Sequence, residues 1–204
     1  MIRNTKQGDL SLREMSHGSS ITFPQKVLGA QSRKDLPTLP QLDIGKKKSL
    51  ISVFWSPEGL HSLVALPPDA TYDSTFFCQS ILPNIKTGLC TGRRRRTLRG
   101  IILHMDNARP LNSKISRDAI EATKAKRVEH PPYSPDLAPS DFFLFGALKV
   151  KLSGSSFSTE QDLISLIREK FLEISKQVLV RAYQHWSERL QWVIDNEGEY
   201  YQSS

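Results

Sequence analysis

The sequence predicts a single α/β domain whose sheet mixes parallel and antiparallel strands. Segments 49–55 and 60–66 are rich in β-branched and aromatic residues, and the Ser-Pro-Glu-Gly turn between them is typical of a hairpin. Helical patterns then alternate with a short apolar run, residues 101–105, of the kind found in a central strand. A hairpin followed by alternating helix and strand favours helices packed against a mixed sheet.

The first 45 residues carry the weakest pattern. They are rich in Ser, Gln, Lys and Pro and have little periodicity, and only residues 21–28 have the apolar content of a weak strand. We therefore expect residues 1–45 to form a poorly defined N-terminal segment, with at most a degenerate first strand. Residues 46–204 are expected to form the folded domain.

Five helices are expected after the hairpin, because apolar side chains recur there at three- and four-residue steps. Their predicted starts are Asp73 or Ser74, Ser113, Asp141, Ser158 and a position shortly before Leu179. Gln161 follows Ser158 by three residues, which is the spacing of a capping box.

The composition limits the classes of function. The chain has 204 residues and a formal net charge of +7, a balance that suits a polyanionic partner. Cys78 and Cys90 lack a CxxC spacing, so we expect reduced thiols rather than a disulfide framework or a zinc site. No apolar run approaches the roughly 20 residues of a membrane span, and the N-terminus lacks the apolar core of a signal peptide. We expect a soluble intracellular protein with no membrane partner.

Two aspartates stand where a metal site could form. Asp106 directly follows the apolar run 101–105, and ligands of open α/β sheets gather at the carboxyl ends of strands. Asp141 begins an aromatic helix after a proline-rich loop, which could present it to the same strand edge. Carboxylates brought together are costly unless a cation lies between them, and Mg²⁺ or Mn²⁺ prefers such oxygen ligands. A pair of such ions can promote phosphodiester cleavage.

Each of these acids also has an ordinary structural interpretation. Asp141 follows Ser140 at a helix start, where either residue is a common N-cap. Asp106 could belong to a simple strand-end turn, and Asp136 to a turn within the proline-rich loop. His104 is expected to be a core histidine bonded to backbone rather than a site residue. From spacing alone these alternatives stay open.

Two strings together resemble the catalytic core of mariner-type transposases, in the Tc1/mariner superfamily: LHMDNARP around Asp106 and HPPYSPDLAPSDFFLFG around Asp141. The resemblance extends over about residues 46–201. It implies an RNase H-like mixed sheet flanked by helices, with three acidic residues on a pair of Mg²⁺ or Mn²⁺ ions. It also implies cleavage of DNA at transposon ends and strand transfer. By this resemblance Asp106 is the second metal ligand and Asp141 the third.

The sequence departs from the family at several positions. The first acid should lie on an early strand in a Gly-Asp-Glu-like setting, and Glu14 is the only acid at the corresponding distance along the chain. No apolar strand pattern surrounds Glu14. Leu111 stands where the family commonly has histidine. The family's paired helix-turn-helix modules have no counterpart, so we expect an N-terminally truncated, decayed or reused catalytic domain.

Basic residues suggest contact with nucleic acid. The predicted phosphate-binding residues are Arg93, Arg94, Arg95, Arg96 and Arg109. The arginine run could equally be a solvated loop or a nuclear localisation signal, and Arg109 could pair with a surface acid. We expect DNA as the partner, a homodimer through the family's dimer surfaces, and a nuclear location.

Three functional alternatives follow. The first is a metal-dependent enzyme that cleaves DNA and transfers strands, with weak or absent catalysis because the first acid is missing or displaced. The second is a non-catalytic remnant that binds nucleic acid or protein. The third is a chain without function.

Overall fold

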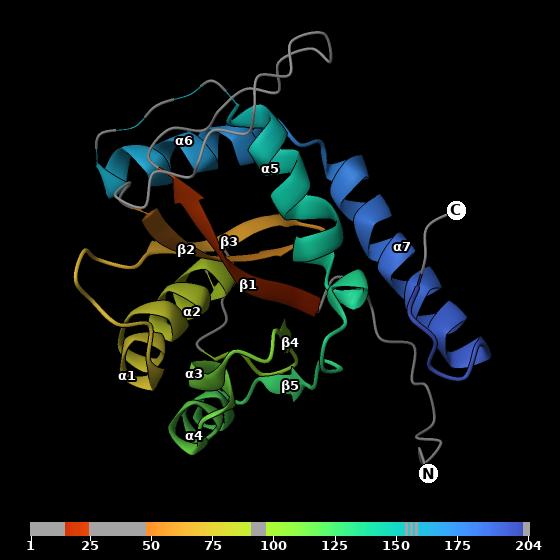
Figure 1. Ribbon diagram of the computed structural model, residues 1–204. Coiled ribbons are helices and arrows are strands. Elements are labelled where there is room, and N and C mark those ends of the chain that lie inside the picture. The colour runs from red at the N-terminus through yellow and green to blue at the C-terminus, as the bar shows by residue number, and fades with distance from the viewer. Residues whose placement is uncertain are drawn as a thin grey trace, which may run out of the picture.

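The protein is built around a five-stranded mixed sheet with the strand order β3-β2-β1-β4-β5 (Figure 1). The computed structural model describes residues 15–24, 48–90, 97–153, 155, 157 and 159–201. The strands are β1 (Met15–Pro24), β2 (Lys48–Ser56), β3 (Gly59–Ala65), β4 (Ile102–Met105) and β5 (Lys126–Val128). β2 pairs antiparallel with both β1 and β3, whereas β4 pairs parallel with both β1 and β5. The predicted mixed sheet is therefore confirmed.

Strand β1 differs from the sequence-based expectation. A weak strand was expected over residues 21–28 in a loop-like region, but β1 spans Met15–Pro24 and occupies the centre of the sheet. Backbone pairing with β2 on one side and β4 on the other holds it there. Such pairing stabilises a strand whatever its local pattern, because strand preference depends strongly on context. The rest of the expected N-terminal segment lies outside the described residues.

The helices lie on both faces of the sheet. One layer contains α1 (Ser74–Phe76), the π-helical η2 (Phe77–Ile81), α2 (Leu82–Cys90), α3 (Arg109–Asn112) and α4 (Lys114–Ala122). The other contains the π-helical η4 (Ser140–Leu144), α5 (Phe145–Lys151), α6 (Glu160–Leu172) and α7 (Lys176–Asp195). The 3₁₀ helix η3 (Pro135–Leu137) lies in the proline-rich loop.

The helix caps largely match the predicted starts. Asp73 and Ser113 each accept a hydrogen bond from a backbone N–H of the first turn. The prediction for α6 was wrong by one residue: the capping box joins Thr159 and Asp162, not Ser158 and Gln161. The carboxylate of Asp162 accepts from the N–H of Thr159 and also places negative charge in the first turn, which an amide would not do.

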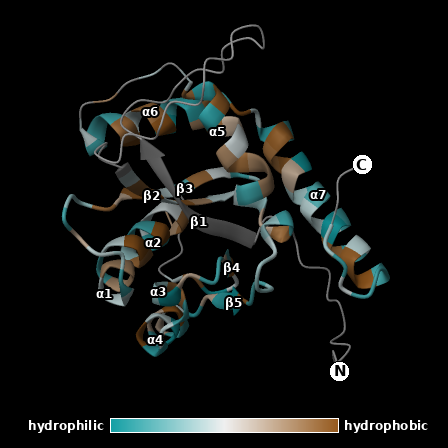
Figure 2. Ribbon diagram, in the orientation of Figure 1, coloured by the Kyte–Doolittle hydropathy of each residue, from teal (hydrophilic) through white to brown (hydrophobic). Residues whose placement is uncertain are grey.

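Two apolar clusters fill the spaces on either side of the sheet. Along β2, Val53 and Trp55 point toward α5, α6 and α7, whereas Phe54 packs with the cluster that includes α2. This alternation is the period of a strand buried on both faces. Figure 2 shows hydrophobic and hydrophilic residues alternating along α6 and α7, as expected for helices that cover one side of a core.

In the part of the chain that the structure describes, no helix has the length and apolar character needed to cross a membrane.

Candidate active site

Asp106 lies at the carboxyl end of the buried strand β4. Its Oδ1 accepts a hydrogen bond of 3.0 Å from the N–H of Ala108, which turns the chain out of the strand before α3 begins at Arg109. Asp106 is partly buried. Asp106 therefore forms the strand-end turn and also lies at the edge of the sheet. Its part in the turn does not exclude a part in a site.

The end of β4 is tied to the beginning of the proline-rich loop. The side-chain amide of Asn107 donates a 2.7 Å hydrogen bond to the carbonyl oxygen of His130. The rings of His130 and His104 are also in contact, with 3.1 Å between Nδ1 and Nε2. These contacts fix where the loop that carries the second aspartate starts.

His104 is a core residue, as expected. Its ring packs against Trp186 of α7, with 4.7 Å between centroids, and only 3% of the residue is exposed. Burial, together with the charge of His130, lowers the pKa of His104 to about 3, so the ring is neutral near neutral pH. Its partners include the His130 ring, where backbone was expected.

The loop separates its two aspartates into different environments. Asp136 is buried, and its Oδ2 accepts a 3.0 Å hydrogen bond from the backbone N–H of Tyr201. Arg189 of α7 donates a 2.9 Å hydrogen bond to the carbonyl oxygen of Asp136. Asp136 therefore does more than form the predicted turn: it ties the loop to the C-terminal segment.

Asp141 is presented to solvent by the packing of its neighbour. Ser140 is fully buried and its Oγ accepts a 3.1 Å hydrogen bond from Trp55 Nε1 of β2. Pro139, not Asp141, occupies the position before η4, and no side chain caps that helix. Because Ser140 points inward to Trp55, Asp141 is left on the exposed side of the same turn.

The charge of Asp106 acts on the carboxyl group of Asp141. Although Asp141 is exposed overall, the protein around its carboxylate and the charge of Asp106 raise its pKa above the ordinary value, an effect that Lys149 partly offsets. The repulsion is the electrostatic condition under which a divalent cation would be attracted to the pair.

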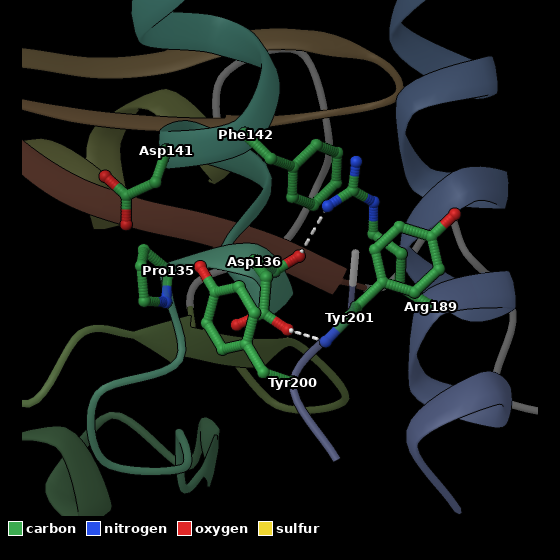
Figure 3. Close-up of a pocket in the computed structure, with 7 residues that line it drawn as sticks. All are labelled: Pro135, Asp136, Asp141, Phe142, Arg189, Tyr200 and Tyr201. Atoms are coloured by element: carbon green, nitrogen blue, oxygen red, sulfur yellow. Dashed lines mark hydrogen bonds between the residues drawn. The ribbon is translucent and has the colours of Figure 1, made fainter. Parts of the chain in front are cut away.

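A cleft of about 530 Å³ lies beside Asp141. Figure 3 shows Asp141 at one side of it and the guanidinium of Arg189 between two aromatic rings at the other. The Arg189 carbon Cζ lies 4.0 Å from the Phe142 ring centroid and 4.5 Å from that of Tyr201.

The described residues do not complete a metal site. Among them, no group of three or more His, Cys, Asp or Glu side chains is placed to hold a metal ion. Mg²⁺ and Mn²⁺ are bound through several oxygen ligands, and the pair of Asp106 and Asp141 supplies only part of such a set. Glu14 and the run Arg93 to Arg96 lie outside the described residues. Arg109 begins α3 and is exposed.

Comparison with known proteins finds relatives over most of the chain. Histone-lysine N-methyltransferase SETMAR of Homo sapiens is 27% identical over 168 residues, which cover 79% of this chain and 24% of that protein. Mariner Mos1 transposase of Drosophila mauritiana is 27% identical over 157 residues, which cover 76% of this chain and 45% of that protein. The chain thus spans less than half the length of each of these relatives. No protein-family model matches it.

Solved structures of Mos1 transposase share the fold. The catalytic domain alone has a TM-score of 0.75 at 24% identity, covering 94% of this chain and 86% of that one. A paired-end complex with the left transposon end has a TM-score of 0.79 at 22% identity and covers 94% and 57%. A paired-end complex with Mn has a TM-score of 0.78 at 23% identity and covers 94% and 57%. The chain resembles the catalytic domain of mariner-type transposases. Its predicted RNase H-like fold is confirmed.

Two further residues have structural roles in this chain. Leu111, at the position where the family commonly has histidine, is 2% exposed and belongs to the apolar cluster beside β4, so it serves packing. Arg189, which the sequence patterns did not single out, joins α7 to the loop and the C-terminal segment. The sequence predicts the apolar stripe of α7 but not the role of Arg189, because an arginine held between rings leaves no periodic pattern.

Proposed function

We propose that this chain is a transposase-derived domain of the mariner type that binds DNA and whose metal-dependent cleavage is weak or absent. The observation that supports it is that Asp141, which lines a cleft, lies close enough to Asp106 for that charge to raise its pKa, with no third ligand among the described residues. A weakly bound cation would leave DNA binding intact while limiting the chemistry.

DNA binding rests on charge. The net charge of +7 favours a polyanion, and mariner-type neighbours include a complex with a transposon end. The residues proposed to contact phosphates remain Arg93 to Arg96 and Arg109. Such contacts are independent of sequence, so the domain alone would bind duplex DNA without strong preference.

Other features of this function are proposals as well. The cation would be Mg²⁺ or Mn²⁺, because Asp106 and Asp141 offer carboxylate oxygens and Mos1 complexes with each metal share the fold. A homodimer is proposed from the family resemblance, and a nuclear location from the run Arg93 to Arg96.

A single set of assays tests the proposed function. Duplex DNA binding is measured at increasing salt for the unmodified chain, for Asp106→Ala and for a variant with Arg93 to Arg96 replaced by alanine. We expect log affinity to fall with log salt by roughly 0.9 per phosphate contact, with a smaller slope for the arginine variant. Asp106→Ala should bind as the unmodified chain does. In parallel, nicking of plasmid DNA with Mn²⁺ should stay close to that of Asp106→Ala.

Two results would contradict the proposal. DNA binding that is absent, or insensitive to salt, would remove the binding function. Robust nicking that disappears in Asp106→Ala would show an active enzyme rather than one with impaired cleavage.

A further inference from the structure

Strand β1 carries a residue at the same level of the sheet as Asp106. In the parallel pair of β1 and β4, the register runs one residue at a time and ends with Gly18 beside Met105. The next step along both chains places Ser19 beside Asp106, since β1 continues to Pro24 and Asp106 follows Met105 directly. Neighbouring strands are roughly 5 Å apart, so the two backbones are close at this level.

The second neighbour of β1 identifies the face of the sheet on which position 19 lies. Ser19 is paired with Val53 of β2, which is fully buried in the cluster under α5, α6 and α7. On the other side, His104 precedes Asp106 by two residues and packs against Trp186 of α7. Residues paired across strands share a face, and residues two apart on one strand do too. Both neighbours therefore put position 19 on the face covered by α5, α6 and α7.

The segment that carries Asp141 lies over the same strand. η4 contacts β1, and Ser140 within η4 is bonded to Trp55 of β2, the next strand. Trp55 is in turn paired with His17, two residues before Ser19. Position 19 thus lies on β1 beside the end of β4, where Asp106 follows, and under the layer that contains η4 with Asp141.

We propose that position 19 is the third corner of the cation site, and that the chain holds a divalent cation poorly because this corner is a serine. This inference rests on the proposed function, since it assumes that Asp106 and Asp141 are the other two corners. The order Gly18-Ser19-Ser20 then stands where a Gly-Asp-Glu-like setting is expected on an early strand. A neutral hydroxyl supplies one weak oxygen ligand and none of the negative charge that a divalent cation requires.

The inference assigns the place of the first metal ligand to position 19 rather than to Glu14. Glu14 precedes the first residue of β1, whereas the position in register with Asp106 is five residues further along the strand.

The test is to supply the missing carboxylate. Ser19→Asp in the full chain should bind Mn²⁺ at least about tenfold more tightly than the unmodified chain, the order of change that one partner makes at a metal site. Affinity is measured from the free Mn²⁺ signal in electron paramagnetic resonance, and folding without metal is followed by circular dichroism. Added Mn²⁺ should also raise the melting temperature of Ser19→Asp more than that of the unmodified chain.

Matched variants isolate the cause. Ser19→Asn has the shape of aspartate without its charge and should bind Mn²⁺ as weakly as the unmodified chain. Adding Asp106→Ala to Ser19→Asp should remove the gain, and Glu14→Gln should change nothing. No gain in a folded Ser19→Asp, or loss of Mn²⁺ binding in Glu14→Gln, would overturn the inference.

A second variant covers the case in which three carboxylates prevent folding without metal. Ser19→Cys is close in size to serine and offers a thiolate to Cd²⁺, whose binding gives an ultraviolet charge-transfer band. We expect this band in Ser19→Cys but not in the unmodified chain, whose thiols are those of Cys78 and Cys90. The band should weaken when Asp106→Ala is added. Absence of this band would overturn the inference even if Ser19→Asp does not fold.

The metal assays are separate from the DNA assays. DNA binding is measured without metal on the unmodified chain. A Mn²⁺ gain in Ser19→Asp without any DNA binding would contradict the proposed function and leave the inference about position 19 standing. DNA binding with no Mn²⁺ gain would contradict the inference about position 19 and leave the proposed DNA-binding function standing.

Discussion

At the residue scale, the chemistry of the proline-rich loop depends on which way three neighbouring side chains point. Ser140 turns inward to bond with Trp55, whereas Asp136 and Asp141 both line the cleft, Asp136 buried beside Tyr201 and Asp141 exposed. A buried carboxylate with hydrogen bonds contributes to structure, whereas a carboxylate near another acid at a cleft edge can attract a cation. Two aspartates of one loop thus differ in role because of their partners.

Buried histidines should make the stability depend on pH. Burial lowers the pKa of His61 to about 4, and its Nε2 lies 2.6 Å from Ser56 Oγ. Between its ordinary pKa of 6.5 and about 4, the unfolded chain binds a proton that the folded chain does not, so stability falls as the pH falls. From about pH 7 to about pH 5 we expect His61 to cost about 2 kcal/mol of unfolding free energy.

Urea titrations of the unmodified chain and of His61→Gln at the two pH values check this. His61→Gln should lose less stability on acidification, and the difference isolates His61 because His104 contributes equally to both proteins. An identical loss in the two proteins would show that His61 is not responsible.

At the element scale, a close approach between α2 and β3 is possible only because of a glycine. A Cβ at Gly88 would lie 1.7 Å from the carbonyl oxygen of His61, which is backbone and cannot move without shifting the strand. In contrast, a Cβ at Gly146 of α5 would meet no atom within 4 Å. The two helical glycines therefore have different reasons to be there.

We expect Gly88→Ala and Gly146→Ala to change stability in opposite directions. Gly88→Ala should lose about 3 kcal/mol or more, because α2 must move off the sheet. Gly146→Ala should gain up to about 1 kcal/mol, because alanine favours the helix. Chemical denaturation of both variants measures the effect, and equal changes would show that α2 and β3 are not in close contact.

At the scale of the whole molecule, contacts around Arg189 join three segments that are distant in sequence. Arg189 of α7 bonds to Asp136 of the loop and lies between the rings of Phe142 and Tyr201. Trp192 packs edge-on against Tyr201, with 5.4 Å between centroids. The segment around Tyr201 is thereby held beside the candidate site.

Arg189→Ala should therefore loosen the C-terminal segment. Loss of the hydrogen bond and of both ring contacts should cost about 2–4 kcal/mol. Arg181→Ala is the control, since Arg181 is an exposed arginine on the same helix and its removal should change stability by less than about 0.5 kcal/mol. Unfolding midpoints and limited proteolysis near Tyr201 report both effects. A similar loss in the two variants would mean that the Arg189 contacts add nothing specific.

The sequence by itself determined the β2–β3 hairpin, the buried strand β4, most helix starts and the pairing of Asp106 with Asp141 as candidates. These features are local: they follow from strand and helix periods, turn residues and two specific strings. Only the tertiary structure decided that residues 15–24 form the central strand, that Asp136 binds the C-terminal segment and that Gly18 pairs with Met105, the residue before Asp106. Strand register and long-range hydrogen bonds join residues far apart in the chain through backbone groups that every residue carries, so no local pattern of side chains records them.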